Sequence, residues 1–187
     1  MPRALALPLT LVLLAFVALP ALAQPPAAAP AAAPAAGGIR GDILRSIDDA
    51  REKLIALAEA TPAEKYTWRP AEKVRSASEV FMHVAGGNYF IPTFWGVKAP
   101  EGLSREMEKE TDKAKVIDAL KKSFDHVRQA IESASDADLD KGIKMFGQDS
   151  TVRAGMLVVA SHAHEHLGQA IAYARMNGIV PPWSAGG

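Results

Sequence analysis

The 187-residue sequence contains no cysteine. Disulfide bonds, thiolate metal ligands and a cysteine nucleophile are therefore excluded. The fold must be held together by its buried core. Any strong metal site must be built from histidine, aspartate or glutamate side chains.

An excess of charge of one sign is also absent. The 21 Lys and Arg residues balance the 21 Asp and Glu residues, and no long run of one sign occurs. Proteins that bind nucleic acid usually present a strongly basic surface. No nucleic-acid partner is therefore expected.

Residues 1–23 have the pattern of a secretory signal peptide. Arg3 gives a short positive start, an apolar stretch follows, and an Ala-Leu-Ala motif provides the cleavage site. We expect the mature chain to begin at Gln24 and to be periplasmic or secreted, with no stable membrane anchor after cleavage. An uncleaved anchor is the alternative, because the apolar stretch approaches the roughly 20 residues that a spanning helix needs.

A Pro/Ala-rich segment without charge, residues 24–38, follows the signal. This composition favours a disordered linker. Residues 39–187 have the composition and length of one globular domain with a single core. Apolar residues at helical spacing predict four long helices in this domain. Their expected ranges are about 42–60, 76–91, 111–133 and 151–177.

The helix boundaries are predicted from capping residues and prolines. Asp42 and Thr111 are available to cap the first and third helices. Ser76 and Glu79 fit a capping box at the start of the second helix. Pro92 should end that helix, because proline lacks an amide hydrogen and clashes with the preceding turn.

The segments between the helices give no convincing set of strands. We expect a loop at residues 97–110, and loop or short extended structure at 136–148. Four amphipathic helices without strands are most simply buried as a four-helix bundle, so the predicted fold class is all-α. The long connection between the second and third helices allows them to run parallel or antiparallel.

Histidines of the second and fourth helices are the candidate metal ligands. His162 and His166 are four residues apart and share one face of the fourth helix, whereas His164 points away from them. A zinc-type ion needs three or four ligands. His83, on the apolar side of the second helix, is the best additional donor. His126 is the competitor, but it lies off the apolar stripe of the third helix and is expected to face solvent.

Spacing alone leaves other interpretations open. The pair could be ordinary polar residues at a bundle surface, and His83 a hydrogen-bonded core residue. The H-E-x-x-H motif of a metalloprotease is absent, because Ala163 follows His162. A ferritin-like di-iron site would need Glu-x-x-His, but Gly168 stands three residues after Glu165.

Several further motifs accompany these histidines in a fixed order. They are Trp68-Arg69-Pro70, the Ser76-capped helix with His83, His162-x-x-x-His166-x-x-Gln169, and Asn177-Gly178-Ile179-Val180-Pro181-Pro182. Together they resemble the DinB-like family over nearly all of residues 39–184. The resemblance implies a four-helix bundle that binds a divalent metal, commonly nickel or zinc. The implied ligands are His83, His162 and His166.

The resemblance also implies an activity, because active members of the family are thiol-dependent transferases and isomerases. Three neutral imidazoles leave an ion with an open position, as in catalytic zinc sites. Low-molecular-weight thiols are kept reduced in the cytoplasm, so export argues against simple transfer of that activity. A metal-dependent hydrolase using bound water is the second expectation, again with a small-molecule substrate. The alternative is a non-catalytic helical binding module with a structural or absent metal, and a homodimer is compatible with either.

Three further polar residues lie near the predicted ligands in the sequence. Glu79 precedes His83 by one helical turn, and Glu165 adjoins His166. Either carboxylate could support the site, although Glu79 also closes a capping box and Glu165 could simply be solvated. Gln169 follows His166 by three residues and could orient it through a hydrogen bond.

Overall fold

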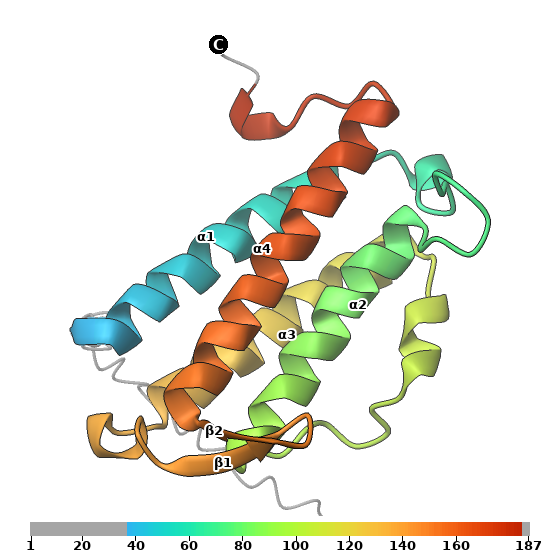
Figure 1. Ribbon diagram of the computed structural model, residues 1–187. Helices are drawn as coiled ribbons and strands as arrows, with labels where there is room; N and C mark the ends of the chain where they lie inside the picture. Colours follow the sequence, from blue (N-terminus) through green and yellow to red (C-terminus); the bar gives the residue numbers. More distant parts are fainter. Residues whose placement is uncertain (1–36, 185–187) are drawn as a thin grey trace, which may run out of the picture. The chain divides into compact units, whose positions relative to one another are not determined.

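The computed structural model describes residues 37–184, and its main feature is a bundle of four long helices (Figure 1). The four helices are α1 (Gly38–Ala60), α2 (Ala77–Phe90), α3 (Lys113–Glu132) and α4 (Val152–Met176). Five short 3-10 helices lie between or after them: η1 (Ala63–Lys65), η2 (Ile91–Trp95), η3 (Arg105–Lys109), η4 (Asp136–Asp138) and η5 (Pro182–Ser184). The all-α fold class is therefore confirmed.

Two parts of the sequence prediction fall outside this description. The predicted signal peptide, residues 1–23, and residues 24–36 of the predicted linker lie outside the described residues. Between residues 37 and 184, no helix is both long and apolar enough to cross a membrane.

The predicted starts of α2 and α4 are correct, and in both a side chain caps the backbone directly. In α2 the Ser76 hydroxyl accepts from the Glu79 amide at 3.3 Å, and the Glu79 carboxylate accepts from the Ser76 amide at 2.7 Å. This is the predicted capping box. In α4 the Thr151 hydroxyl accepts from the Ala154 amide at 3.3 Å. The α-helical part of α2 ends at Phe90, two residues before Pro92.

Two predicted caps were wrong. The first helix begins at Gly38, before Asp42, and its first turn is anchored by Arg40, which pairs with Asp136 at 3.3 Å. The third helix is capped by Asp112, whose carboxylate accepts from the Lys115 amide at 3.0 Å, and not by Thr111. In α1 a long-range ion pair anchors the first turn in place of the predicted cap. In α3 the residue next to the predicted cap takes its role.

A short β-hairpin precedes α4, in the region where loop or short extended structure was expected; the pairing of two strands was not predicted. Strand β1 (Gly142–Met145) pairs antiparallel with β2 (Gln148–Thr151). The two turn residues, Phe146 and Gly147, have positive φ angles of 50° and 82°. Such two-residue turns usually carry Asn-Gly, and a phenylalanine at positive φ gives no hairpin signal in the sequence. The predicted loop at residues 97–110 likewise contains η3.

The helices run in an up-down-down-up order. Helices α1 and α3 are antiparallel, because Lys113 at the start of α3 donates to the Glu59 carbonyl at 2.7 Å, whereas Arg40 pairs with Asp136 at the other end. Figure 1 shows α2 and α3 running in the same direction, with α4 opposite to both. The long connection between α2 and α3 returns the chain to the end of the bundle where α2 began. The parallel arrangement left open by the sequence is therefore the observed one.

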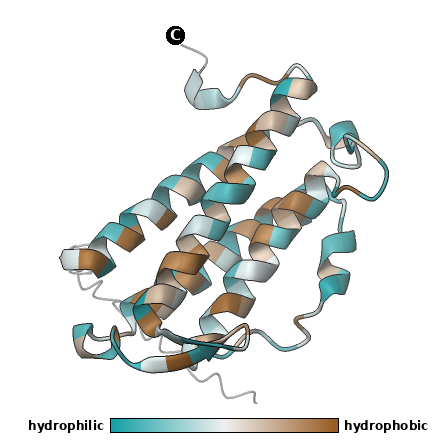
Figure 2. Cartoon of the chain, in the orientation of Figure 1, coloured by the Kyte–Doolittle hydropathy of each residue, from teal (hydrophilic) through white to brown (hydrophobic). Residues whose placement is uncertain are grey.

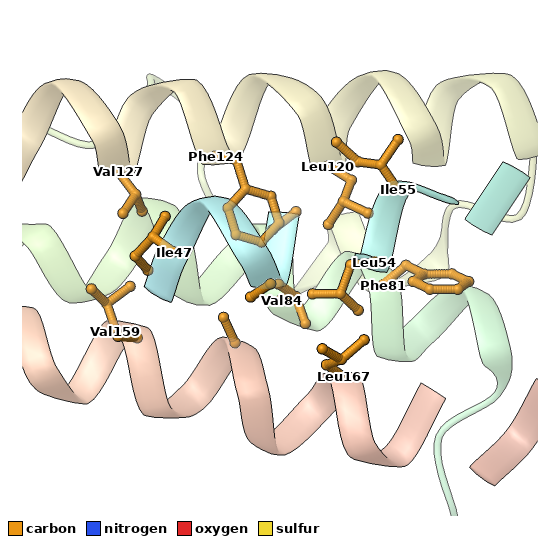
Figure 3. Packing of buried hydrophobic residues seen from close by; sticks show 14 of the residues in the cluster. Ile47, Leu54, Ile55, Phe81, Val84, Leu120, Phe124, Val127, Val159 and Leu167 are labelled. Carbon is orange, nitrogen blue, oxygen red and sulfur yellow. The ribbon is translucent and has the colours of Figure 1, made fainter. Parts of the chain in front are cut away.

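The core lies along the bundle axis and receives side chains from all four helices. Each long helix carries both hydrophobic and hydrophilic residues (Figure 2), as expected for helices with one buried face. Figure 3 shows Ile47, Val84, Phe124 and Val159, one from each helix, directed toward a common interior. None of these four residues has any exposed surface. This packing fixes the spacing between α2 and α4, on which the histidines lie.

Replacement of Phe124 by alanine should strongly destabilise the bundle. The ring is fully buried, and its loss would remove apolar burial and leave a cavity that costs about 3–5 kcal/mol. The free energy of unfolding can be measured by urea denaturation. Leu157→Ala is the matched control, because the Leu157 side chain is 46% exposed. Equal stability losses in the two variants would contradict this assignment of the core.

Candidate metal centre

Three histidines from two antiparallel helices meet between α2 and α4. His83 comes from α2, whereas His162 and His166 come from successive turns of α4. One nitrogen from each imidazole lies within 4.8 Å of a nitrogen of both others. The ring centroids of His166 lie 4.6 Å from those of both His83 and His162. All three side chains are half-buried, so the cluster lies at the edge of the bundle and not in its core.

Gly87 makes this close approach of the two helices sterically feasible. A Cβ atom added at Gly87 would lie 2.3 Å from Cε1 and 2.8 Å from Nδ1 of His162. No side chain larger than hydrogen fits there unless the imidazole or one of the helices moves. The ring of His162 therefore packs directly on the α2 backbone, one helical turn after His83.

A carboxylate from the connection between α2 and α3 holds His83. Nδ1 of His83 lies 2.9 Å from Oε1 of Glu108, and Nε of Arg75 donates to Oε2 of Glu108 at 3.0 Å. Because a carboxylate accepts hydrogen bonds, the proton of a neutral His83 belongs on Nδ1. Its Nε2 atom then presents a lone pair to the other histidines.

A side-chain amide holds His166 through Nδ1, as the carboxylate of Glu108 holds His83. Nδ1 of His166 lies 2.8 Å from Oε1 of Gln169, and the Gln169 amide donates to the Tyr173 hydroxyl at 2.9 Å. Tyr173 in turn meets the Trp68 ring edge-on, with centroids 5.4 Å apart. This chain directs the Nε2 lone pair of His166 away from Gln169.

The donor set fits a divalent ion of the zinc or nickel type. Nε2 of His162 lies 3.3 Å from Nε2 of His83. Two nitrogens bound to one tetrahedral zinc at the usual bond length are separated by about 3.3–3.4 Å. Without an ion, the same separation suits a hydrogen bond donated by His162, since His83 carries its proton on Nδ1. Nδ1 of His162 is buried and has no hydrogen-bond partner within the described part of the chain.

The environment of His83 and His162 favours the neutral imidazole, the form that binds a metal ion. Burial, followed by the neighbouring His166, His83 and Arg75, lowers the pKa of His162 to about 4. Burial also lowers the pKa of His83, against the opposing effect of Glu108. For Glu108, burial tends to raise the pKa, but the hydrogen bonds from Arg75 and His83 outweigh it and hold the pKa below its usual value. The Glu108 carboxylate is therefore ionised beside a neutral His83.

Two other carboxylates considered from the sequence have different surroundings. Glu79 accepts from the Ser76 amide and pairs with Arg69 at 2.9 Å. Glu165 is exposed on α4. Neither belongs to a group of histidine and acidic side chains that could hold an ion, as judged from residues 37–184.

The remaining histidines of the bundle lie apart from the cluster. His164 packs toward α1, where its Nε2 lies 3.0 Å from the Ser46 carbonyl oxygen. His126 was expected to face solvent, but it is half-buried against Tyr89, with ring centroids 5.2 Å apart. Tyr89 projects from α2 toward α3 and covers one side of the ring, which a stripe of apolar residues on one helix does not reveal.

Sequence reasoning missed Glu108 and Arg75. Both lie outside the long helices, Glu108 in η3 and Arg75 just before the α2 capping box. The connection carries four glutamates, Glu101, Glu106, Glu108 and Glu110, and nothing in their spacing selects one of them. Only the return of this segment alongside α2 brings Glu108 to His83.

Replacement of Gly87 by alanine should displace His162 and destabilise the protein. The added methyl group would overlap the imidazole, and overpacking of this kind costs about 1–3 kcal/mol. Gly86→Ala is the matched control, because the nearest atom to its added Cβ is the Met107 sulfur at 3.4 Å. Thermal melting and the NMR shifts of the His162 ring would measure both effects. If Gly87→Ala matched Gly86→Ala in both measurements, the contact between Gly87 and the His162 ring would not be needed for stability or for the position of the ring.

Comparisons with known proteins agree with this architecture. A DinB-like protein from Bacillus cereus superposes with a TM-score of 0.68 at 19% identity, covering 77% of this chain and 95% of that one. A DinB-like protein from Bacillus subtilis gives a TM-score of 0.60 at 25% identity, covering 74% and 93%. A conserved protein from Enterococcus faecalis gives 0.61 at 15% identity, covering 75% and 98%. No match was found among the curated proteins.

The sequence itself also matches a family model. Residues 46–170 match the model of the DinB superfamily. The matched region includes all three clustered histidines and parts or all of the four long helices. The chain belongs to the DinB superfamily.

Proposed function

We propose that this protein binds one divalent metal ion, nickel or zinc, through His83, His162 and His166. The observation that carries the proposal is the convergence of three imidazole nitrogens within 4.8 Å of one another. The hydrogen bonds of His83 and His166 leave the Nε2 atom of each as the available donor. Neutral imidazole is a common ligand for both metals.

We further propose that the protein is an enzyme that acts on a small molecule by group transfer or hydrolysis. The cluster has three protein ligands within the described residues, and catalytic zinc sites likewise use three and leave a position for water or substrate. An ion bound there would supply a Lewis acid and lower the pKa of a bound water or thiol. The histidines are half-buried, so part of each side chain is open to solvent.

Transfer to a thiol requires less of the surrounding residues than hydrolysis does. Hydrolysis needs a general base near the bound water, but Glu79 is engaged by Ser76 and Arg69, and Glu108 is engaged by His83 and Arg75. A thiol bound to a metal ion is deprotonated without a base from the protein. The residues around the site therefore favour group transfer, whereas the proposed export weighs against a thiol cosubstrate, because low-molecular-weight thiols are kept reduced in the cytoplasm.

A structural metal is the second candidate. His83 and the α4 histidines lie on different helices, so an ion between them would link α2 to α4. Bound metal would then contribute mainly to folding stability.

Metal analysis with histidine variants should test the metal site. The purified chain should contain about one nickel or zinc ion, and His83→Ala or His162→Ala should lose it, because two imidazoles hold a divalent ion poorly. His164→Ala is the matched control, since this histidine contacts Ser46 on α1. Elemental analysis of metal-replete protein measures the occupancy. Absence of stoichiometric metal in the wild type would overturn the proposal.

Melting in chelator should separate the enzymatic role from the structural one. Metal at 100 times its dissociation constant adds about 2.7 kcal/mol of stability to any folded protein that binds it. A loss of about this size on chelation is expected of a catalytic site. Unfolding of the metal-free chain at ambient temperature would instead support the structural role.

We propose that the protein works outside the cytoplasm, in the periplasm or as a secreted chain. The supporting feature is the signal-like pattern of residues 1–23. Intact-mass measurement of the protein from fractionated cells should give a chain that begins at Gln24. A full-length chain recovered from the cytoplasm would contradict export.

A further inference from the structure

The connection between α2 and α3 packs closely against α2 near His83. Figure 1 shows η3 beside α2, and the Met107 side chain is partly buried against the core. The Met107 sulfur faces Gly86, where an added Cβ would lie 3.4 Å away. This anchor places the next residue, Glu108, opposite His83.

Both carboxylate oxygens of Glu108 are engaged. Oε1 lies 2.9 Å from Nδ1 of His83, and Oε2 accepts from Nε of Arg75 at 3.0 Å. The side chain is 23% exposed. By contrast, Glu106 of the same 3-10 helix is 71% exposed and pairs with Lys109. Glu108 is thus held between a histidine and a guanidinium, whereas its neighbour is a solvated surface residue.

The three histidines differ in what holds their second ring nitrogen. His83 has the ionised carboxylate of Glu108, and His166 has the neutral amide of Gln169. Nδ1 of His162 has no partner in the part of the chain that the structure describes. Hydrogen bonds to an ionised acceptor are about twice as strong as those between neutral groups. Of the three histidines, His83 therefore has the strongest hydrogen bond to its second ring nitrogen.

We propose that Glu108 is a positioning residue of the metal centre and that Arg75 holds it in place. The carboxylate fixes His83 as the Nδ1–H tautomer and directs Nε2 toward His162 and His166. It also makes the imidazole a stronger donor to a cation. The connection between α2 and α3 thereby becomes a functional part of the centre. This inference rests on the proposed metal binding.

Metal affinity of Glu108 variants should test this role. Glu108→Gln keeps the side-chain size but removes the charge, and loss of such a carboxylate weakens metal binding by about 10–100-fold. Arg75→Gln should weaken binding by a smaller factor, because Glu108 remains present but is less firmly held. Glu106→Gln is the matched control and should bind as the wild type does. Competition with a chromophoric chelator, using zinc, measures the dissociation constants.

Two further measurements separate positioning from a general structural role. The metal-free melting temperature of Glu108→Gln should stay close to that of Glu106→Gln. In the metal-free wild type, the ring nitrogen shifts of His83 should report a proton on Nδ1. A proton found on Nε2 would overturn the proposal whether or not the variant folds.

The outcomes distinguish this inference from the proposed function. If the wild type binds zinc and Glu108→Gln binds it equally well, the role of Glu108 is wrong and the metal site stands. If the wild type binds no zinc or nickel, the proposed function itself fails.

Discussion

The close approach of α2 and α4 is the constraint on which the histidine cluster depends. A histidine on one helix cannot share an ion with a pair on another unless the two backbones come close together. Gly87 permits this, because the His162 ring occupies the space of its missing side chain. The buried residues of the bundle keep the spacing, since displacement of α2 from α4 would open voids in a close-packed core.

The three histidines share one cluster but have unequal support, and this inequality shows how the centre is built. Support for His166 is local, because Gln169 lies within one turn of the same helix. Support for His83 comes from far along the chain, through Glu108 and then Arg75. The centre therefore combines a preformed part on α4 with a part that exists only when the connection between α2 and α3 has packed.

The sequence predicted the features that depend on local chemistry. The capping box of α2, the four helices and the helical spacing of His162 and His166 follow from residues within a few positions of one another. His83 was selected as the additional donor because it lies on the apolar side of the second helix, and the DinB-like resemblance supported that choice. Features that depend on tertiary contacts were missed. Glu108, for example, has no distinguishing neighbours in the sequence. The short extended structure expected before α4 is present, but its pairing into a hairpin was not predicted, because the turn contains Phe146, a residue type that rarely adopts positive φ.

Helix α4 is the last of the four long helices in the sequence, and this bears on the order of folding. Domains generally fold as units, and a partly synthesised chain without α4 contains only one of the three clustered histidines. A single imidazole holds a divalent ion weakly. Such a chain would therefore lose an ion that the complete cluster of three histidines could retain. Metal retained by these histidines would thus mark chains whose final long helix has already docked.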